Sequence, residues 1–198
     1  MAMPISVSKS ARRVWTISDL ERLPDDGNRY EILHGELLVT PMPSIGHQRV
    51  TARLFVGLAI WCRAHTGWTF LSPGGVYMSE TTWLEPDAAI YASPEYGDAD
   101  WRQMPPPVLV VETQSKSTAR RDRFRKRPAY LSHGVKEVWI VIEKSRTVER
   151  WTSASEFPET HGDLITWRPD ATKPAFTMTA VELFGPLPPA RTISGTTE

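Results

Sequence analysis

The chain has 198 residues, of which 40% are hydrophobic and 23% are charged, and its 23 basic residues balance its 23 acidic ones. This length and composition predict one folded domain with a sizeable core, and they exclude a disordered polyelectrolyte and a generally basic nucleic-acid coat protein. The single cysteine, Cys62, excludes an intramolecular disulfide framework and fits a reducing compartment.

The ends of the chain predict no leader or membrane anchor. Residues 1–14 lack the apolar run of a secretory signal, and the longest apolar run, residues 54–62, is too short to span a bilayer. We therefore expect a cytoplasmic protein with no membrane partner. The expected domain covers residues 15–190, between a flexible N-terminus over residues 1–14 and a flexible tail over residues 191–198.

The first third of the chain predicts a helix, a hairpin and a second helix. A short helix is expected over residues 16–23, and a β-hairpin with a tight turn is expected over residues 29–40. Ser44 can cap a longer helix, in which apolar residues recur at helical spacing to about His65.

The remaining two thirds alternate between strands and one helix. Strand patterns between turn signals occur over residues 68–71, 75–79, 85–91, 108–114, 137–142, 146–152, 163–167 and 176–184. A helix expected over residues 118–132 joins two of these strands, and such a short crossover predicts that they are parallel. The next strand, residues 146–152, should pair antiparallel with its predecessor. Pro128 predicts a bend or a late restart of the helix between Arg125 and Tyr130.

Several kinds of site are excluded by missing motifs. The chain has no phosphate-binding loop with Gly-Lys-Ser/Thr, no Gly-x-Gly-x-x-Gly turn and no Gly-x-Ser-x-Gly elbow. Its five histidines lack the spacing of zinc ligands. The chemistry that remains is that of oxygen ligands.

Two acids flank short β-prone apolar runs. Asp87 directly precedes Ala88-Ala-Ile-Tyr91, and Glu112 follows Val108-Leu-Val-Val111. A buried carboxylate that is alone is very costly, so each must be paired, hydrogen-bonded or bound to a cation. Two such acids could share a metal ion.

A basic cluster follows Glu112 directly. Residues 116–127 contain a single acid, Asp122, and seven basic residues: Lys116, Arg120, Arg121, Arg123, Arg125, Lys126 and Arg127. Hydrolysis of a phosphodiester suits this combination, because carboxylates hold Mg²⁺ and cations position the polyanion. The alternative is a solvated helix face.

The order of these motifs resembles a known superfamily. Glu85-Pro-Asp87 in one strand, Glu112-Thr-Gln114 ending the next, then a basic helix and an apolar strand, resemble the PD-(D/E)XK nucleases. The similarity is closer to the Uma-two family of restriction-endonuclease-like proteins, and it covers roughly residues 15–151. It rests on these segments: Tyr30-Glu-Ile-Leu-His-Gly-Glu36, Ser44 to Gln48, Glu85-Pro-Asp87, Val110-Val-Glu-Thr-Gln-Ser115, and Ser117-Thr-Ala-Arg-Arg-Asp-Arg123 with Lys126 and Tyr130.

The resemblance implies an α/β fold with a central mixed β-sheet flanked by helices, an N-terminal β-hairpin and a metal-dependent active site. Asp87 and Glu112 would bind Mg²⁺ or Mn²⁺, with the main-chain carbonyl of Thr113 as a further ligand. Glu36 would be a third acid. The alternatives without a metal are that Asp87 belongs to a turn or caps a strand end, that Glu112 pairs with a helix arginine, and that Glu36 is a surface acid of the hairpin.

The chain departs from the superfamily motif at Gln114, where the motif has lysine. Alternation places Gln114 on the same face as Glu112, but an amide carries no charge and accepts no proton from water. Lys126 could supply the missing charge from the following helix, as the family pattern implies; alternatively the metal alone activates the water, or activity is lost. The alternative role for Lys126 is that of a surface cation.

Two accessory residues and the basic cluster complete the expected site. His47 and Gln48 lie in the first turn of the long helix, and both could face the site; packing or surface exposure is the alternative. Nucleic acid would be bound by the basic residues Lys116, Arg120, Arg121, Arg123 and Arg125.

The sequence thus predicts a Mg²⁺-dependent endonuclease acting on DNA, as a homodimer because cutting both strands usually requires two active sites. Two other hypotheses are a nuclease fold kept as a non-catalytic module that binds nucleic acid or a protein, and a phosphodiesterase acting on RNA or nucleotides. No separate target-recognition domain fits in this length, so sequence specificity is not assigned.

Overall fold

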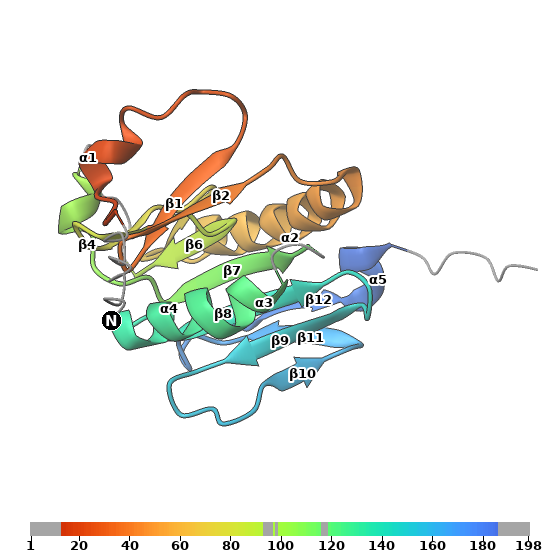
Figure 1. Ribbon diagram of the computed structural model, residues 1–198. Helices are drawn as coiled ribbons and strands as arrows, with labels where there is room; N and C mark the ends of the chain where they lie inside the picture. Colours follow the sequence, from red (N-terminus) through yellow and green to blue (C-terminus); the bar gives the residue numbers. More distant parts are fainter. Residues whose placement is uncertain (1–12, 93–96, 98, 116–118, 186–198) are drawn as a thin grey trace, which may run out of the picture.

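The computed structural model describes residues 13–92, 97, 99–115 and 119–185, which form a mixed α/β fold around a six-stranded sheet (Figure 1). In this sheet β7 runs parallel to β8 and the other neighbours are antiparallel. The strand order is β10 (Glu159–His161), β9 (Thr147–Trp151), β8 (Glu137–Ile142), β7 (Leu109–Gln114), β6 (Ala88–Tyr91) and β3 (Thr69–Leu71). The predicted fold class and the predicted parallel pair are confirmed.

A second sheet of four strands contains the N-terminal hairpin. Its order is β2 (Glu36–Thr40), β1 (Arg29–Leu33), β5 (Thr82–Leu84) and β4 (Val76–Ser79). The hairpin turn places His34 at φ 52° and Gly35 at φ 77°, as a tight turn between paired strands requires. The strand predicted over residues 85–91 begins only at Ala88, and β5, which precedes it, was not predicted.

Helices pack on both faces of the six-stranded sheet, and two short ones contact the four-stranded sheet. They are α1 (Ile17–Leu20), α2 (Ile45–Ala64), the 3₁₀ turn η1 (Trp101–Gln103), α3 (Ala119–Arg121), the π-helical turn η2 (Asp122–Lys126), α4 (Arg127–His133) and α5 (Ala180–Phe184). The long helix α2 is capped by Ser44, whose side chain accepts a hydrogen bond from the His47 backbone N–H. This cap and helix are as predicted.

The helix after β7 differs from the expected form. Its backbone stays helical from Ala119 to His133, and the N–H of Arg127 bonds to the carbonyl of Asp122, five residues back. This wider turn ends before Pro128, whose ring would otherwise meet the carbonyl four residues earlier. The helix is thus irregular where the sequence predicted it: a π turn ends at Lys126 and a regular α-helix starts again at Arg127, between Arg125 and Tyr130.

The C-terminal part of the described chain adds a small sheet and a helix. Strands β11 (Leu164–Trp167) and β12 (Phe176–Thr179) pair antiparallel. The strand predicted over residues 176–184 is wrong beyond Thr179, because Thr179 and Glu182 form a capping box that starts α5. The expected flexible segments, residues 1–14 and 191–198, lie outside the described residues apart from Arg13 and Val14.

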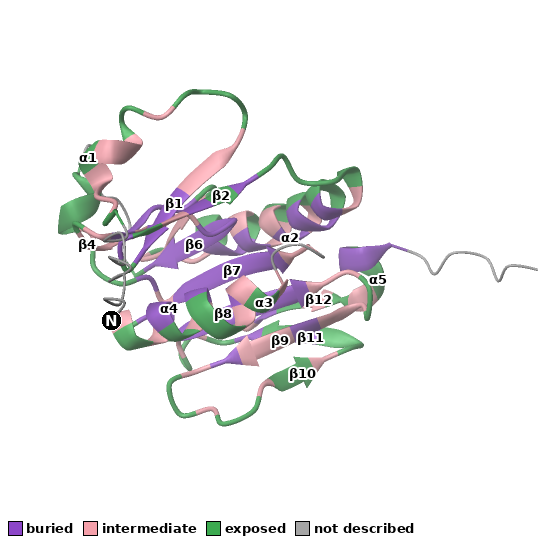
Figure 2. Ribbon diagram, viewed as in Figure 1, coloured by how far each residue is buried: buried purple, intermediate pink, exposed green. Residues whose placement is uncertain are grey.

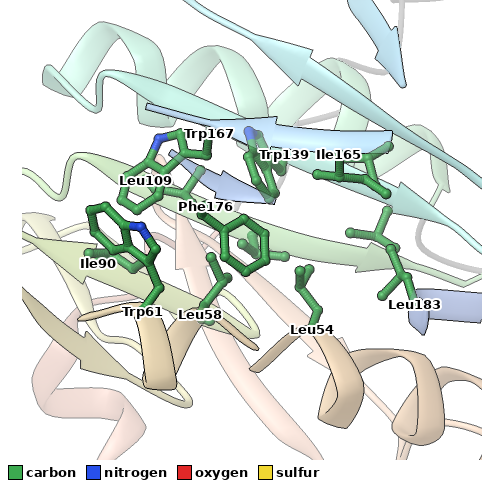
Figure 3. Packing of buried hydrophobic residues seen from close by; sticks show 14 of the residues in the cluster. Leu54, Leu58, Trp61, Ile90, Leu109, Trp139, Ile165, Trp167, Phe176 and Leu183 are labelled. Carbon is green, nitrogen blue, oxygen red and sulfur yellow. The ribbon is translucent and has the colours of Figure 1, made fainter. Parts of the chain in front are cut away.

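Two hydrophobic clusters lie on opposite faces of the six-stranded sheet, and its central strands are buried (Figure 2). The larger cluster joins the sheet to α2, β11, β12 and α5, with Leu54, Leu58 and Trp61 of α2 against Trp139 and Trp167 (Figure 3). Cys62 is buried in this cluster. The smaller cluster joins the sheet to α4 and the four-stranded sheet. Among the described residues, no helix is long and apolar enough to cross a membrane.

Candidate active site

Asp87 lies where the chain passes from the four-stranded sheet to the six-stranded one, and both of its carboxylate oxygens are bonded. The Arg29 guanidinium donates to Oδ1 at 2.9 Å, and the backbone N–H of Thr113 donates to Oδ2 at 2.7 Å. Burial alone would raise the pKa of Asp87, but the hydrogen bond from His47 and the charge of Arg29 lower it to about 2. Asp87 is therefore held as a carboxylate.

His47 connects α2 to the end of β7. Its Nε2 lies 2.8 Å from the Thr113 carbonyl oxygen and 3.4 Å from Asp87 Oδ2. Since a carbonyl only accepts, Nε2 carries the hydrogen, and Asp87 Oδ2 and the Thr113 carbonyl share this one donor. Burial lowers the pKa of His47, but its hydrogen bond and ion pair with Asp87 outweigh this and raise it. The predicted accessory residue His47 is thus brought against two of the three predicted metal ligands.

Glu112 is held on the other side of β7, by the helix that follows. Lys126 Nζ lies 3.1 Å from Glu112 Oε1, and the Tyr130 hydroxyl donates to the same oxygen at 2.7 Å. Lys126 and Tyr130 are four residues apart on one helix face and are both fully buried. Burial raises the pKa of Glu112 to about 7, against the charge of Lys126, which lowers it. Lys126 is thus brought to Glu112, as predicted, and is no surface cation.

Glu31 is a buried acid of the site that sequence reasoning missed. Its Oε1 accepts from Lys126 Nζ at 2.7 Å and from the Glu85 backbone N–H at 2.8 Å, so Lys126 bridges Glu31 and Glu112. Glu31 Oε2 is buried and has no hydrogen-bond partner among the described residues. A signal was present in the sequence: alternation along β1 puts Glu31 on the face of Leu33, which a hairpin strand would bury.

A cavity of about 800 Å³ opens beside these residues. Its lining comes from β1, the β2–α2 loop, the end of β7, the start of α3 and the residues after β8. The lining includes Arg29, residues 40–44, His47, residues 112–115, Ala119, Asp122 and residues 142–144. Glu112 and Thr113 therefore border open space that a substrate could enter.

Gln114, at the motif position of the lysine, also borders this cavity. Its amide Nε2 donates to the Ala119 carbonyl at 3.4 Å, at the start of α3. The side chain is thus on the cavity side with Glu112, as alternation predicts, but its amide is bonded to the helix backbone.

Two predicted site residues are not brought to Asp87 and Glu112. Glu36 is exposed on β2 and pairs with the Arg125 guanidinium at 2.9 Å, which fits the alternative of a surface acid of the hairpin. The buried acid that shares Lys126 with Glu112 is Glu31. Gln48 is exposed on α2 and does not line the cavity. Consecutive side chains of an α-helix point about 100° apart around its axis, so Gln48 does not point in the same direction as His47.

The predicted nucleic-acid-binding arginines are mostly engaged within the protein. Arg121 donates to Thr40 Oγ1 at 2.6 Å, Arg123 pairs with Glu149, and Arg125 pairs with Glu36. Arg120 is exposed. Lys116 lies outside the described residues.

Comparison with known proteins places the chain in a family. A family model, Uma2, described as "Putative restriction endonuclease", matches residues 17–180. The chain belongs to the Uma2 family.

A solved structure supports the fold of this Uma2 protein. The crystal structure of "a putative nuclease belonging to DUF820" from Anabaena variabilis ATCC 29413 superposes with a TM-score of 0.69 at 15% sequence identity, over 86% of this chain and 97% of that one. At this identity the likeness shows the fold. A search of curated proteins found no match.

The chemical type of the donor atoms in this Uma2 site suits a divalent cation. Carboxylate and carbonyl oxygens are the ligands that Mg²⁺ and Mn²⁺ prefer, and Asp87 Oδ2 and the Thr113 carbonyl already converge on one hydrogen-bond donor. Within the described ranges, however, no three His, Cys, Asp or Glu side chains form a ready metal cluster. A cation would have to replace the His47 N–H between these two oxygens.

The acids Glu31, Asp87, Glu112 and Asp122 are all buried. In the part of the chain that the structure describes, Arg29, Arg121 and Lys126 are cationic side chains in contact with them. The site is therefore a buried cluster of carboxylates and cations.

Proposed function

We propose that this protein is a metal-dependent endonuclease that hydrolyses phosphodiester bonds of DNA. The proposal rests on one observation above all: Asp87 bonds the Thr113 backbone at the end of β7, and the adjacent Glu112, paired with Lys126, lines a cavity there. This arrangement follows the motif order of the PD-(D/E)XK nucleases.

In this proposal Asp87, Glu112 and the Thr113 carbonyl hold Mg²⁺ or Mn²⁺. The bound ion would polarise the scissile phosphate and lower the pKa of a water molecule. His47 would orient Asp87 and the Thr113 carbonyl in the absence of the ion. These roles are supported by the donor types and by the shared contact with His47 Nε2.

Lys126 would act through Glu112 rather than on the substrate. Its ammonium group is fully buried between Glu31 and Glu112, so it does not border the cavity. Its charge favours the ionised form of Glu112 and fixes the direction of that carboxylate. Lys126, Glu31 and Tyr130 are therefore proposed as positioning residues.

Gln114 is proposed to contact the attacking water or a phosphate oxygen. It borders the cavity on the Glu112 side, and its bond to Ala119 is long at 3.4 Å. As a neutral amide it can orient a water molecule but cannot remove its proton. Activation of the water would fall to the metal.

Cleavage assays test the proposal. Supercoiled plasmid should be nicked with Mg²⁺ or Mn²⁺, and Asp87→Asn and Glu112→Gln should each lose at least about 100-fold in rate, since each removes a metal ligand. Glu36→Gln, an exposed acid on β2, is the matched control and should cleave at the wild-type rate. Equal cleavage by all variants would assign the activity to a contaminant. RNA and dinucleotide substrates in parallel separate DNA from the other phosphodiester substrates.

The second candidate is a nuclease fold that binds nucleic acid without cutting it. It is favoured by the engagement of both Asp87 oxygens with Arg29, Thr113 and His47, which a metal must displace. Titration calorimetry with Mn²⁺ decides: no heat of binding, together with salt-sensitive DNA binding, would favour this candidate.

Two further properties belong to the proposal. Cutting both strands at one place usually requires two active sites, so we expect a homodimer, which light scattering would detect. The lone cysteine is buried and unpaired with another cysteine, which suits the reducing conditions of the cytoplasm.

A further inference from the structure

The wall of the active-site cavity formed by the β2–α2 loop is apolar and open to solvent. Pro41, Met42 and Pro43 line the cavity, and Ile45 follows in the first turn of α2. Met42 is 77% exposed and Ile45 is 88% exposed. Large apolar side chains left so open beside a pocket indicate a binding surface.

A cation without an acidic partner borders the same cavity. Lys144, which follows β8, lines the cavity, is exposed, and forms no ion pair among the described residues. The other cation in the lining, Arg29, is committed to Asp87. Among the described residues of the lining, Lys144 is therefore the cation available to an anionic ligand.

The N-terminus of α2 is not available for a phosphate. The Glu143 carboxylate occupies the space beside Gly46, where both of its oxygens would lie 2.8 Å from an added Cβ, and Arg49 pairs with it at 3.5 Å. An anionic ligand would be repelled there. This leaves Lys144 to take the phosphate.

We propose that this cavity takes one unpaired nucleotide, with its phosphate on Lys144 and its base on the wall formed by Pro41, Met42 and Pro43, next to the exposed Ile45. The inference rests on the proposed function and names its substrate class: single-stranded DNA, or a segment in which the strands have separated. In a duplex the base faces are stacked inside and only phosphates and groove edges are exposed, so an apolar wall inside a pocket gains contact only with an unpaired base.

The test uses the full-length protein in EDTA, so that binding is measured without hydrolysis. Fluorescence anisotropy compares a single-stranded oligodeoxynucleotide with a hairpin duplex of the same sequence, across a range of salt concentrations. The variants are Lys144→Ala and the double variant Met42→Ala/Ile45→Ala. Matched controls are Lys136→Ala, at the opposite end of β8, and Ile60→Ala, which is 64% exposed on the same helix as Ile45.

The phosphate contact and the base contact should affect DNA binding in different ways. Lys144→Ala should lower the slope of log affinity against log salt by about 0.7, the value for one phosphate contact on a single strand. The double variant should weaken single-strand binding roughly fivefold or more at an unchanged slope, because it removes base contacts. The single strand should bind more tightly than the duplex, and both controls should match the wild type. All changes are at exposed positions, and circular dichroism checks the fold.

Three results would overturn the inference. The first is equal affinity of the wild type for single-stranded and duplex DNA, with no change in affinity in the Lys144 and Met42/Ile45 variants. In that case plasmid cleavage that depends on Asp87 would still leave the proposed function intact. A dimer that becomes monomeric in the double variant, at constant DNA affinity, would make the apolar wall a protein interface instead. A wild-type protein that neither binds nor cuts nucleic acid would remove the proposed function, and the inference with it.

Discussion

The two faces of β7 meet very different surroundings. On one face Leu109 and Val111 join the apolar cluster that α2 covers. On the other, Val110 is followed by Glu112, which meets a buried lysine and a tyrosine hydroxyl. Apolar contacts tolerate exchange of one hydrophobe for another, whereas a buried carboxylate depends on a few exact partners. The charged face should therefore be the more fragile, and the following changes test this.

Lys126→Ala should have the largest effect. It leaves Glu31 and Glu112 buried without their shared cation, which costs about 3–5 kcal/mol of unfolding free energy. Urea unfolding at pH 7 measures the loss, with the exposed Lys136→Ala as the control. A loss below about 1 kcal/mol would mean that solvent reaches the two acids.

Leu58→Ala probes the apolar face with a slightly smaller expected effect. Leu58 is fully buried under the sheet, and removing its side chain should cost about 3 kcal/mol through lost burial and a residual cavity. The loss should be the same at pH 5 and pH 8, because no titrating group is involved. Ile60→Ala, exposed on the same helix, should change stability by less than about 0.5 kcal/mol.

Asp87→Asn should lower stability by about 2 kcal/mol at pH 7. The folded-state pKa of Asp87 is depressed from 3.8 to about 2, so its ionisation stabilises the fold above pH 4 and this contribution is lost as pH falls toward 2. Unfolding in EDTA between pH 7 and pH 3 should show the variant and wild type converging at low pH. A difference that does not change with pH would contradict the ion pair with Arg29.

Tyr130→Phe removes one donor from Glu112 without opening a cavity. We expect a loss of about 1.5 kcal/mol, the value for a buried hydrogen bond to a charged group. Tyr77→Phe, whose hydroxyl bonds the exposed Glu80, is the matched control and should lose less. Equal losses in the two variants would argue that Glu112 has another donor.

Glu36→Ala should have the smallest effect, below about 1 kcal/mol, because its pair with Arg125 is exposed. The DNA-cleavage rate should stay at the wild-type value. A large loss of activity would return Glu36 to the site and displace Glu31 from it.

Local patterns in the sequence were enough for most of the fold. The spacing of Val50, Leu54 and Leu58 specified α2, and the apolar runs around residues 109–114 and 137–142 specified the parallel pair. Short elements were missed, since β5 and β10 have only three residues each and turn signals adjoin β5. The start of α5 was a missed signal, because Thr179-x-x-Glu182 is a capping-box sequence.

The site was less predictable, because its contacts join residues far apart in the chain. Asp87, Glu112 and Lys126 followed from motif order, but the bridge from Lys126 to Glu31 depends on how two sheets meet. The arginines looked free in the sequence because their partners, Glu36 and Glu149, lie on other elements. Charge counts along a helix do not reveal such pairing.

The π turn over Asp122–Lys126 sets the direction in which the side chains of the following helix point. One extra residue in a turn rotates the following helix by about 100° relative to the preceding one. Arg121 can thus reach Thr40 while Lys126 and Tyr130 face Glu112. Deleting Phe124, which is exposed, would restore a regular helix and leave one of these sets of contacts out of reach. The length of this turn, together with the lysine itself, decides whether a charge from the helix reaches the carboxylate on β7.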